Sequence, residues 1–130
     1  MTNEVMPIER AQKEVDSWLD YRRVRQSKRD AAKAFISSIA EAVQYGLVSF
    51  NESTGELTQR LEFPVDGFIS ELVYKPRLTV ADQNKHVSAT KNANEIYQAY
   101  IAAATNQGLA QIQRMDMADY EVAFAIVNFF

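Results

Sequence analysis

The sequence predicts a mainly helical α+β fold with a small antiparallel β-meander. Apolar residues recur at three- and four-residue spacing in both outer thirds of the chain, alternate with polar residues in the middle third, and are separated there by glycine and proline. With 130 residues, 47% of them hydrophobic, the chain can bury one core but not two. We therefore expect a single domain over 1–130, with a helical part over 1–46, a meander over 47–76 and a second helical part over 77–130.

Two helices are expected in the N-terminal part. The first follows Pro7, and its apolar stripe consists of Ile8, Ala11, Val15, Trp18 and Leu19. The second ends at Gly46, a favourable residue directly after a helix, and its stripe consists of Ala32, Phe35, Ile36, Ile39, Ala40 and Val43. The pattern fits either one long rod or a hairpin that bends near residues 26–30.

The middle third is expected to form two or three short strands, over 47–50, 56–63 and 68–74. Leu57, Leu61 and Phe63 fall on one face of the second strand, and Pro64 is expected to end it. On the third strand, Phe68, Leu72 and Tyr74 share a face. So small a meander needs helices packed on it to be stable.

Two to four helices are expected in the C-terminal part. Thr79 to Asp82 resembles a capping box, and the polar stretch 82–94 is expected to be a loop. One helix carries the stripe Ile96, Tyr97, Tyr100, Ile101 and Ala104; another turn is expected over 109–114. Asp116 is expected to cap a last helix that runs to Phe130.

The residue inventory argues against an enzyme. The absence of cysteine excludes disulfides, thiolate metal sites and cysteine nucleophiles, and His86 is the only histidine. No glycine-rich phosphate loop is present. We interpret Asp116 and Asp119 as helix-capping acids rather than metal ligands. The sequence thus predicts no catalytic residues, no cofactor and no metal.

A basic segment stands out in an otherwise acidic chain. Residues 22–33 hold six basic residues and one acid, net +5, which leaves −8 for the rest of a chain whose total is −3. We interpret this segment as a surface that steers acidic partners electrostatically. The alternative is a small regulatory protein that binds nucleic acid through this helix. The basic residues are Arg22, Arg23, Arg25, Lys28, Arg29 and Lys33.

The C-terminal helix is apolar around nearly its whole circumference. Such a helix is either enclosed in a core or pressed against another chain, and the sequence leaves both possibilities open. Our hypothesis is that apolar residues of the last two helices form a surface for self-association and partner binding, so we expect a homo-oligomer. The residues of this hypothesis are Tyr97, Tyr100, Ile101, Tyr120, Phe124, Val127, Phe129 and Phe130.

Nothing in the sequence indicates a membrane or secreted protein. The uninterrupted apolar runs are far shorter than the roughly 20 residues that span a bilayer. The N-terminal residues lack the charged-then-apolar pattern of a signal peptide. We therefore expect a soluble intracellular protein.

Three segments in order resemble the tail assembly chaperones of long-tailed bacteriophages. ISELVYKPRLTVADQ (69–83) is similar to that family's conserved strand-and-proline stretch, and TQRLEFPVDGF (58–68) is similar to the strand before it. IQRMDMADYEVAFAIVNFF (112–130) resembles the family's closing helix, which often ends in consecutive phenylalanines. The resemblance covers roughly residues 57–130; the shorter members begin almost directly at the strands, without a counterpart of 1–46.

The resemblance implies a non-catalytic factor of viral tail assembly. Such chaperones bind the tape measure protein and the tail tube subunit in the host bacterial cytoplasm during morphogenesis, and they are absent from the finished virion. Family members commonly also exist as a longer product of a translational frameshift. The resemblance assigns no individual binding residues.

Overall fold

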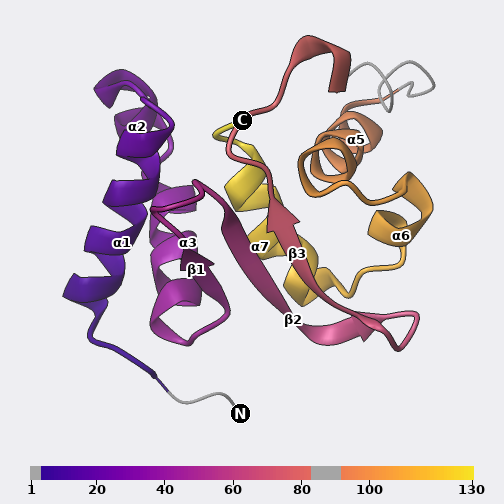
Figure 1. Ribbon diagram of the computed structural model, residues 1–130, viewed down its shortest axis with the longest axis horizontal. Helices are drawn as coiled ribbons and strands as arrows, with labels where there is room; N and C mark the ends of the chain where they lie inside the picture. Colours follow the sequence, from indigo (N-terminus) through magenta and orange to yellow (C-terminus); the bar gives the residue numbers. More distant parts are fainter. Residues whose placement is uncertain (1–3, 83–91) are drawn as a thin grey trace.

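The computed structural model describes residues 4–82 and 92–130. Helix α1 (Ile8–Tyr21) buries the expected stripe, with Ala11, Val15, Trp18 and Leu19 in the core. The chain then reverses through residues 22–25, where Arg23 adopts a left-handed conformation (φ 57°). A short helix α2 (Gln26–Ala31) leads into α3 (Lys33–Gln44), which packs beside α1 (Figure 1). The N-terminal helices therefore form a hairpin and not a rod.

Helix α3 ends just before Gly46, as the sequence predicted. Gly46 has φ 76°, which a residue with a Cβ rarely adopts. Its N–H donates to the carbonyl of Val43, and the N–H of Leu47 donates to the carbonyl of Ala42. These two bonds are the Schellman arrangement, which satisfies carbonyls left over at the helix end. The chain turns here from the helical part into the sheet.

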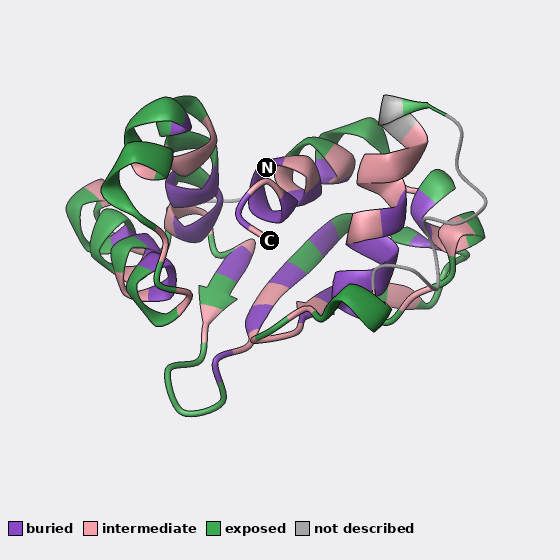
Figure 2. Ribbon diagram, turned by 90° about the horizontal axis from the view of Figure 1, so that it is seen from above, coloured by how far each residue is buried: buried purple, intermediate pink, exposed green. Residues whose placement is uncertain are grey.

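The expected meander is present as a three-stranded antiparallel sheet. Its strands are β1 (Val48–Phe50), β2 (Leu57–Val65) and β3 (Ile69–Tyr74), in the order β1-β2-β3. Leu57 is paired with Tyr74, and Gln59 with Leu72, so these four side chains share the buried face. Arg60 and Glu71, also paired, lie on the exposed face. The purple and green bands along β2 in Figure 2 follow this alternation.

The predicted side-chain alternation of β2 is wrong beyond Leu61. The pairing with β3 is regular up to Arg60 and resumes only at Val65, so the strand is irregular between them. Pro64 lies inside β2 and does not end it. This irregularity leaves Phe63 54% exposed, whereas Val65 is buried. Phe68, expected beside Leu72, lies in the turn before β3 and is 76% exposed.

The C-terminal helices are α5 (Ala93–Thr105), α6 (Leu109–Gln113) and α7 (Met117–Val127). Figure 1 shows α7 behind the sheet, between α3 on one side and α5 on the other, and α7 contacts β2 as well. The helix therefore occupies the centre of the fold. The α+β class with N-terminal and C-terminal helices around a small antiparallel sheet is confirmed.

Two predicted caps are also confirmed. Thr79 and Asp82 exchange side-chain to backbone hydrogen bonds in both directions, as in a capping box. The Asp116 carboxylate accepts a hydrogen bond from the N–H of Ala118 at the start of α7. His86 and most of the expected loop over 82–94 lie outside the described residues.

Candidate functional site: a partner-binding surface

The core encloses much of α7. Ala123, Ala125, Ile126 and Val127 are buried, and the two alanines leave room for neighbouring elements to approach closely. A position in the core thus accounts for part of the helix's apolar circumference. One part that it does not enclose is a half-buried edge that carries Tyr120 and Phe124, one turn apart.

This edge belongs to a strip of five aromatic rings, which we call the aromatic strip. Phe124 is at its centre: its ring centroid is 4.7 Å from that of Tyr97 on α5 and 5.7 Å from that of Phe35 on α3. Tyr120 lies 6.3 Å from Phe124, and Tyr100 lies 6.3 Å from Tyr97. All five rings are half-buried. Three helices distant in sequence thus form one partly exposed aromatic surface.

The strip has the character of a binding surface. Aromatic rings bury a large area on contact and lose little conformational freedom, because the rings of the strip already hold one another in place. Partial burial raises the pKa of the Tyr120 hydroxyl above its ordinary value, through desolvation of the phenolate. Tyr120 therefore stays neutral at physiological pH and presents an apolar ring face together with a hydroxyl group.

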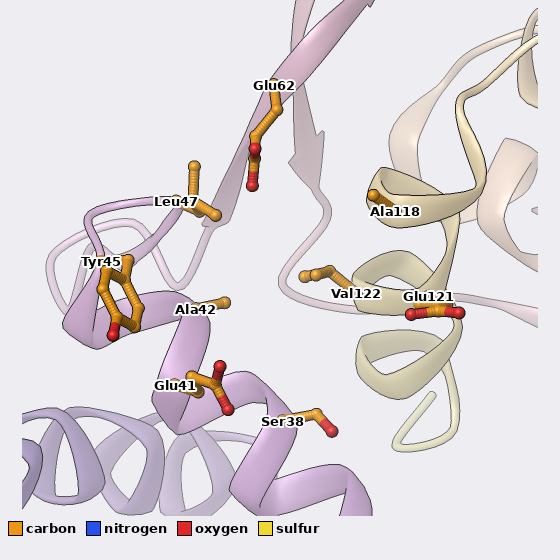
Figure 3. Close-up of a pocket in the computed structure, with 9 residues that line it drawn as sticks. All are labelled: Ser38, Glu41, Ala42, Tyr45, Leu47, Glu62, Ala118, Glu121 and Val122. Carbon is orange, nitrogen blue, oxygen red and sulfur yellow. The ribbon is translucent and has the colours of Figure 1, made fainter. Parts of the chain in front are cut away.

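A groove lies between α3 and α7, next to the Phe35–Phe124 end of the aromatic strip. Its volume is about 430 Å³, and Figure 3 shows its walls: α3 on one side, α7 on the other, and Leu47 and Glu62 at its upper end. The contact between Phe35 and Phe124 marks one end of the groove. Phe35 lies one turn before the groove residue Ser38 on α3, and Phe124 lies shortly after the groove residue Val122 on α7. The lining residues are Ser38, Glu41, Ala42, Tyr45, Leu47, Glu62, Ala118, Glu121 and Val122.

The groove combines an apolar floor with carboxylates. Ala42, Leu47 and Val122 contribute apolar surface, whereas Glu41 and Glu121 are exposed carboxylates on the two opposing helices. Glu62 is a third carboxylate, and the lining contains no lysine or arginine. Within residues 4–82 and 92–130, no three acidic or histidine side chains are close enough together to hold a metal ion. The groove is therefore acidic without being a metal site.

One buried carboxylate fixes the geometry of the groove. Asp119, in the first turn of α7, is 3% exposed and accepts hydrogen bonds from the backbone N–H groups of Glu62 (2.9 Å) and Phe63 (3.0 Å). We expected the Asp119 carboxylate to cap its own helix. That interpretation is wrong, because the carboxylate accepts its hydrogen bonds from the irregular part of β2. It joins the α7 wall of the groove to the strand that carries Glu62.

A second buried polar contact joins the same two elements. The Gln59 side-chain amide donates to the backbone carbonyl of Asp119 (2.8 Å), and its carbonyl accepts a hydrogen bond from the Tyr74 hydroxyl (2.7 Å). Complete burial raises the pKa of Tyr74 well above its ordinary value. Sequence reasoning missed Gln59, although its position between Leu57 and Leu61 on the inward-facing side of β2 was a signal available for it.

Three residues of the predicted surface are in the core. Ile101 is fully buried, Val127 is 2% exposed and Phe129 is 6% exposed, so our prediction that they form an accessible surface is wrong. Ile101 and Val127 lie on the inward sides of α5 and α7, and Phe129 packs edge-on against Trp18. Tyr97, Tyr100, Tyr120 and Phe124 do lie together, in the aromatic strip. Phe130 is half-buried elsewhere, against Trp18 and Tyr74.

The predicted basic surface loses two of its six members. Arg22 donates to the carbonyls of Phe129 and Pro76, and its guanidinium lies 3.7 Å from the centre of the Phe130 ring. Desolvation, with the charge of Arg77 nearby, lowers its pKa to about 10. Arg22 is therefore a structural clamp on the C-terminal residues.

Arg29 is the second of these. It donates to the carbonyl of Val24 and forms an ion pair with Asp20 at 2.8 Å. The other four basic residues of the segment are exposed, namely Arg23, Arg25, Lys28 and Lys33.

Among the helices of the described residues, none combines the length and the apolar character that a membrane-spanning helix needs.

Comparisons with family models, with curated proteins and with solved structures find no match to this chain.

Proposed function

We propose that this protein is a non-catalytic binding protein, and specifically a tail assembly chaperone that holds the tape measure protein and the tail tube subunit during assembly of a long-tailed phage. The observation that carries the binding role is the aromatic strip, in which three helices contribute five half-buried rings to one surface. The three segments that resemble tail assembly chaperones support the specific role. On this proposal the protein acts in the host cytoplasm and is absent from the finished virion.

The strip fits an amphipathic helix as its ligand. Helices are recognised through apolar side chains spaced three and four residues apart, which insert against an apolar surface of the partner. A long helical client exposes such side chains before it assembles. Binding to the aromatic strip would cover them and release them when the tail tube forms, because the strip makes no covalent bond to its client. Without a client, a second copy of this chain would cover the strip, and we expect homo-oligomers that client binding dissociates.

The test is co-expression of the tagged chain with a candidate tape measure protein and with a candidate tail tube protein. Wild-type protein should retain both clients on an affinity column. Replacing Tyr97 and Phe124 together with alanine removes two neighbouring rings and should weaken binding by about 30-fold or more, as expected for central aromatic contacts. Should that variant fold poorly, Tyr97→Ser with Tyr120→Ser removes exposed ring area with less loss of packing.

A matched control removes the same kind of side chain elsewhere. Phe63 and Phe68 are exposed phenylalanines at the β2–β3 hairpin, outside the aromatic strip. Replacing both with alanine should leave client binding within about twofold of wild type. Loss of binding in this control with full retention in the strip variants would contradict the proposed surface. Failure of wild-type protein to retain either client would contradict the chaperone role.

A further inference from the structure

The groove beside the aromatic strip carries negative charge, whereas the strip itself consists of uncharged rings. Glu41 on α3 and Glu121 on α7 line opposite walls of the groove, and Glu62 lies at its end (Figure 3). None of the three forms a salt bridge within the described residues, where the ion pairs involve other acids. The groove is thus a negative site without a positive group of its own.

We infer that this groove binds lysine or arginine side chains of a helical partner. This inference rests on the proposed function for the identity of the client. The chemistry of the groove does not depend on that function. An ammonium or guanidinium group is the complement of carboxylates on two opposing walls. The stems of these side chains are apolar and match a floor of Ala42, Leu47 and Val122. A metal ion does not provide the missing charge, because the described carboxylates are not grouped closely enough to ligate one.

The position of the groove would fix the orientation in which a helical partner binds. It continues the α3–α7 seam from the point where Phe35 and Phe124 meet, so one helix lying along the seam would contact both the groove and this end of the aromatic strip. Its apolar face would cover the aromatic strip, and positive side chains at one end would enter the groove. Such a partner can bind in only one direction. The strip supplies apolar contact for many amphipathic helices, and the groove selects those that are basic at one end.

Two designed helical peptides test this without any phage protein. Both carry the same leucine face, and their polar positions are all lysine in one peptide and all glutamate in the other. Fluorescence anisotropy at low salt should show the lysine peptide binding wild-type protein at least about tenfold more tightly, a preference that about 0.5 M salt should largely remove.

Two double variants with the same change in net charge locate the effect. Glu41→Gln with Glu121→Gln removes two groove charges and should reduce the preference for the lysine peptide to about twofold. Glu52→Gln with Glu56→Gln removes two charges from the β1–β2 loop, which projects away from the rest of the molecule (Figure 2), and should retain the preference.

Equal losses in both double variants would show that only net charge matters and would overturn the inference. Equal binding of the two peptides to wild-type protein, or binding of neither, would overturn it as well. The proposed function can fail separately. If the natural clients are not retained while the lysine peptide binds in a groove-dependent way, the inference stands and the chaperone role falls.

Discussion

Replacing Asp119 with alanine is the perturbation that connects stability to the candidate site most directly. The buried carboxylate accepts hydrogen bonds from two backbone N–H groups of β2, at 2.9 and 3.0 Å. Hydrogen bonds to charged groups contribute about 1.5–3 kcal/mol each, and a buried donor left without a partner costs about 1–3 kcal/mol. Because both donors are only partly buried, water can replace part of the loss. We expect the free energy of unfolding to fall by about 2–4 kcal/mol.

Urea denaturation measures this change, with the fluorescence of Trp18, the only tryptophan, as the probe of the core. The control is Asp116→Ala, which removes the N-cap of the same helix and should cost about 1 kcal/mol. Hydrogen exchange should show that the amides of Glu62 and Phe63 lose protection in the Asp119 variant only. A loss of less than about 0.5 kcal/mol, or unchanged protection of these amides, would refute the assigned role of Asp119.

Three further predictions follow from other contacts. Arg22→Lys keeps the charge but cannot make both carbonyl contacts and stack on the ring below, so urea unfolding should show a loss of about 1–2 kcal/mol; an unchanged midpoint would contradict the clamp. Glu14→Gln should stabilise the protein slightly at pH 7, because burial raises the pKa of Glu14 above 4.5 and its carboxylate is disfavoured in the folded state; thermal unfolding should show the gain vanish near about pH 3, where the carboxyl is protonated in both states. Gly55→Ala should destabilise more than Gly67→Ala, because both have positive φ but a Cβ at position 55 would overlap the Tyr21 ring while position 67 is open; equal losses in chemical denaturation would show that the ring moves aside freely.

Local sequence pattern predicted the helices, the strands and several of their ends. The stripe from Ala11 to Leu19, the glycine after α3 and the capping box at Thr79 depend on residues within a few positions of one another, so they can be read from a short window. The irregularity of β2 could not be predicted in this way. It is stabilised by Asp119, 57 residues from Glu62 in the sequence, and it reverses the expected exposure of Phe63.

The candidate site was predicted in part. Tyr97, Tyr100, Tyr120 and Phe124 were expected on a surface because of their apolar spacing, and the structure brings them together. Periodicity alone does not separate the inward from the outward side of a helix that is apolar all round, so Ile101, Val127 and Phe129 were misplaced.

The remaining parts of the site depend on contacts between elements distant in sequence. Phe35 was expected only in the apolar stripe of α3, and Glu41 was assigned no role; their roles appear only when α3 packs beside α7. Arg22 was misassigned for the same reason, since the C-terminal residues that it contacts are more than 100 positions away.

Hydroxyl-radical footprinting of the chain alone and with its helical client tests the binding surface directly, because it reports the exposure of individual aromatic side chains. The surface described above predicts that Tyr97, Tyr120 and Phe124 lose reactivity on binding, whereas Phe68 on the hairpin does not. Protection of Phe68 with unchanged labelling of the three strip residues would place the client elsewhere and contradict the account.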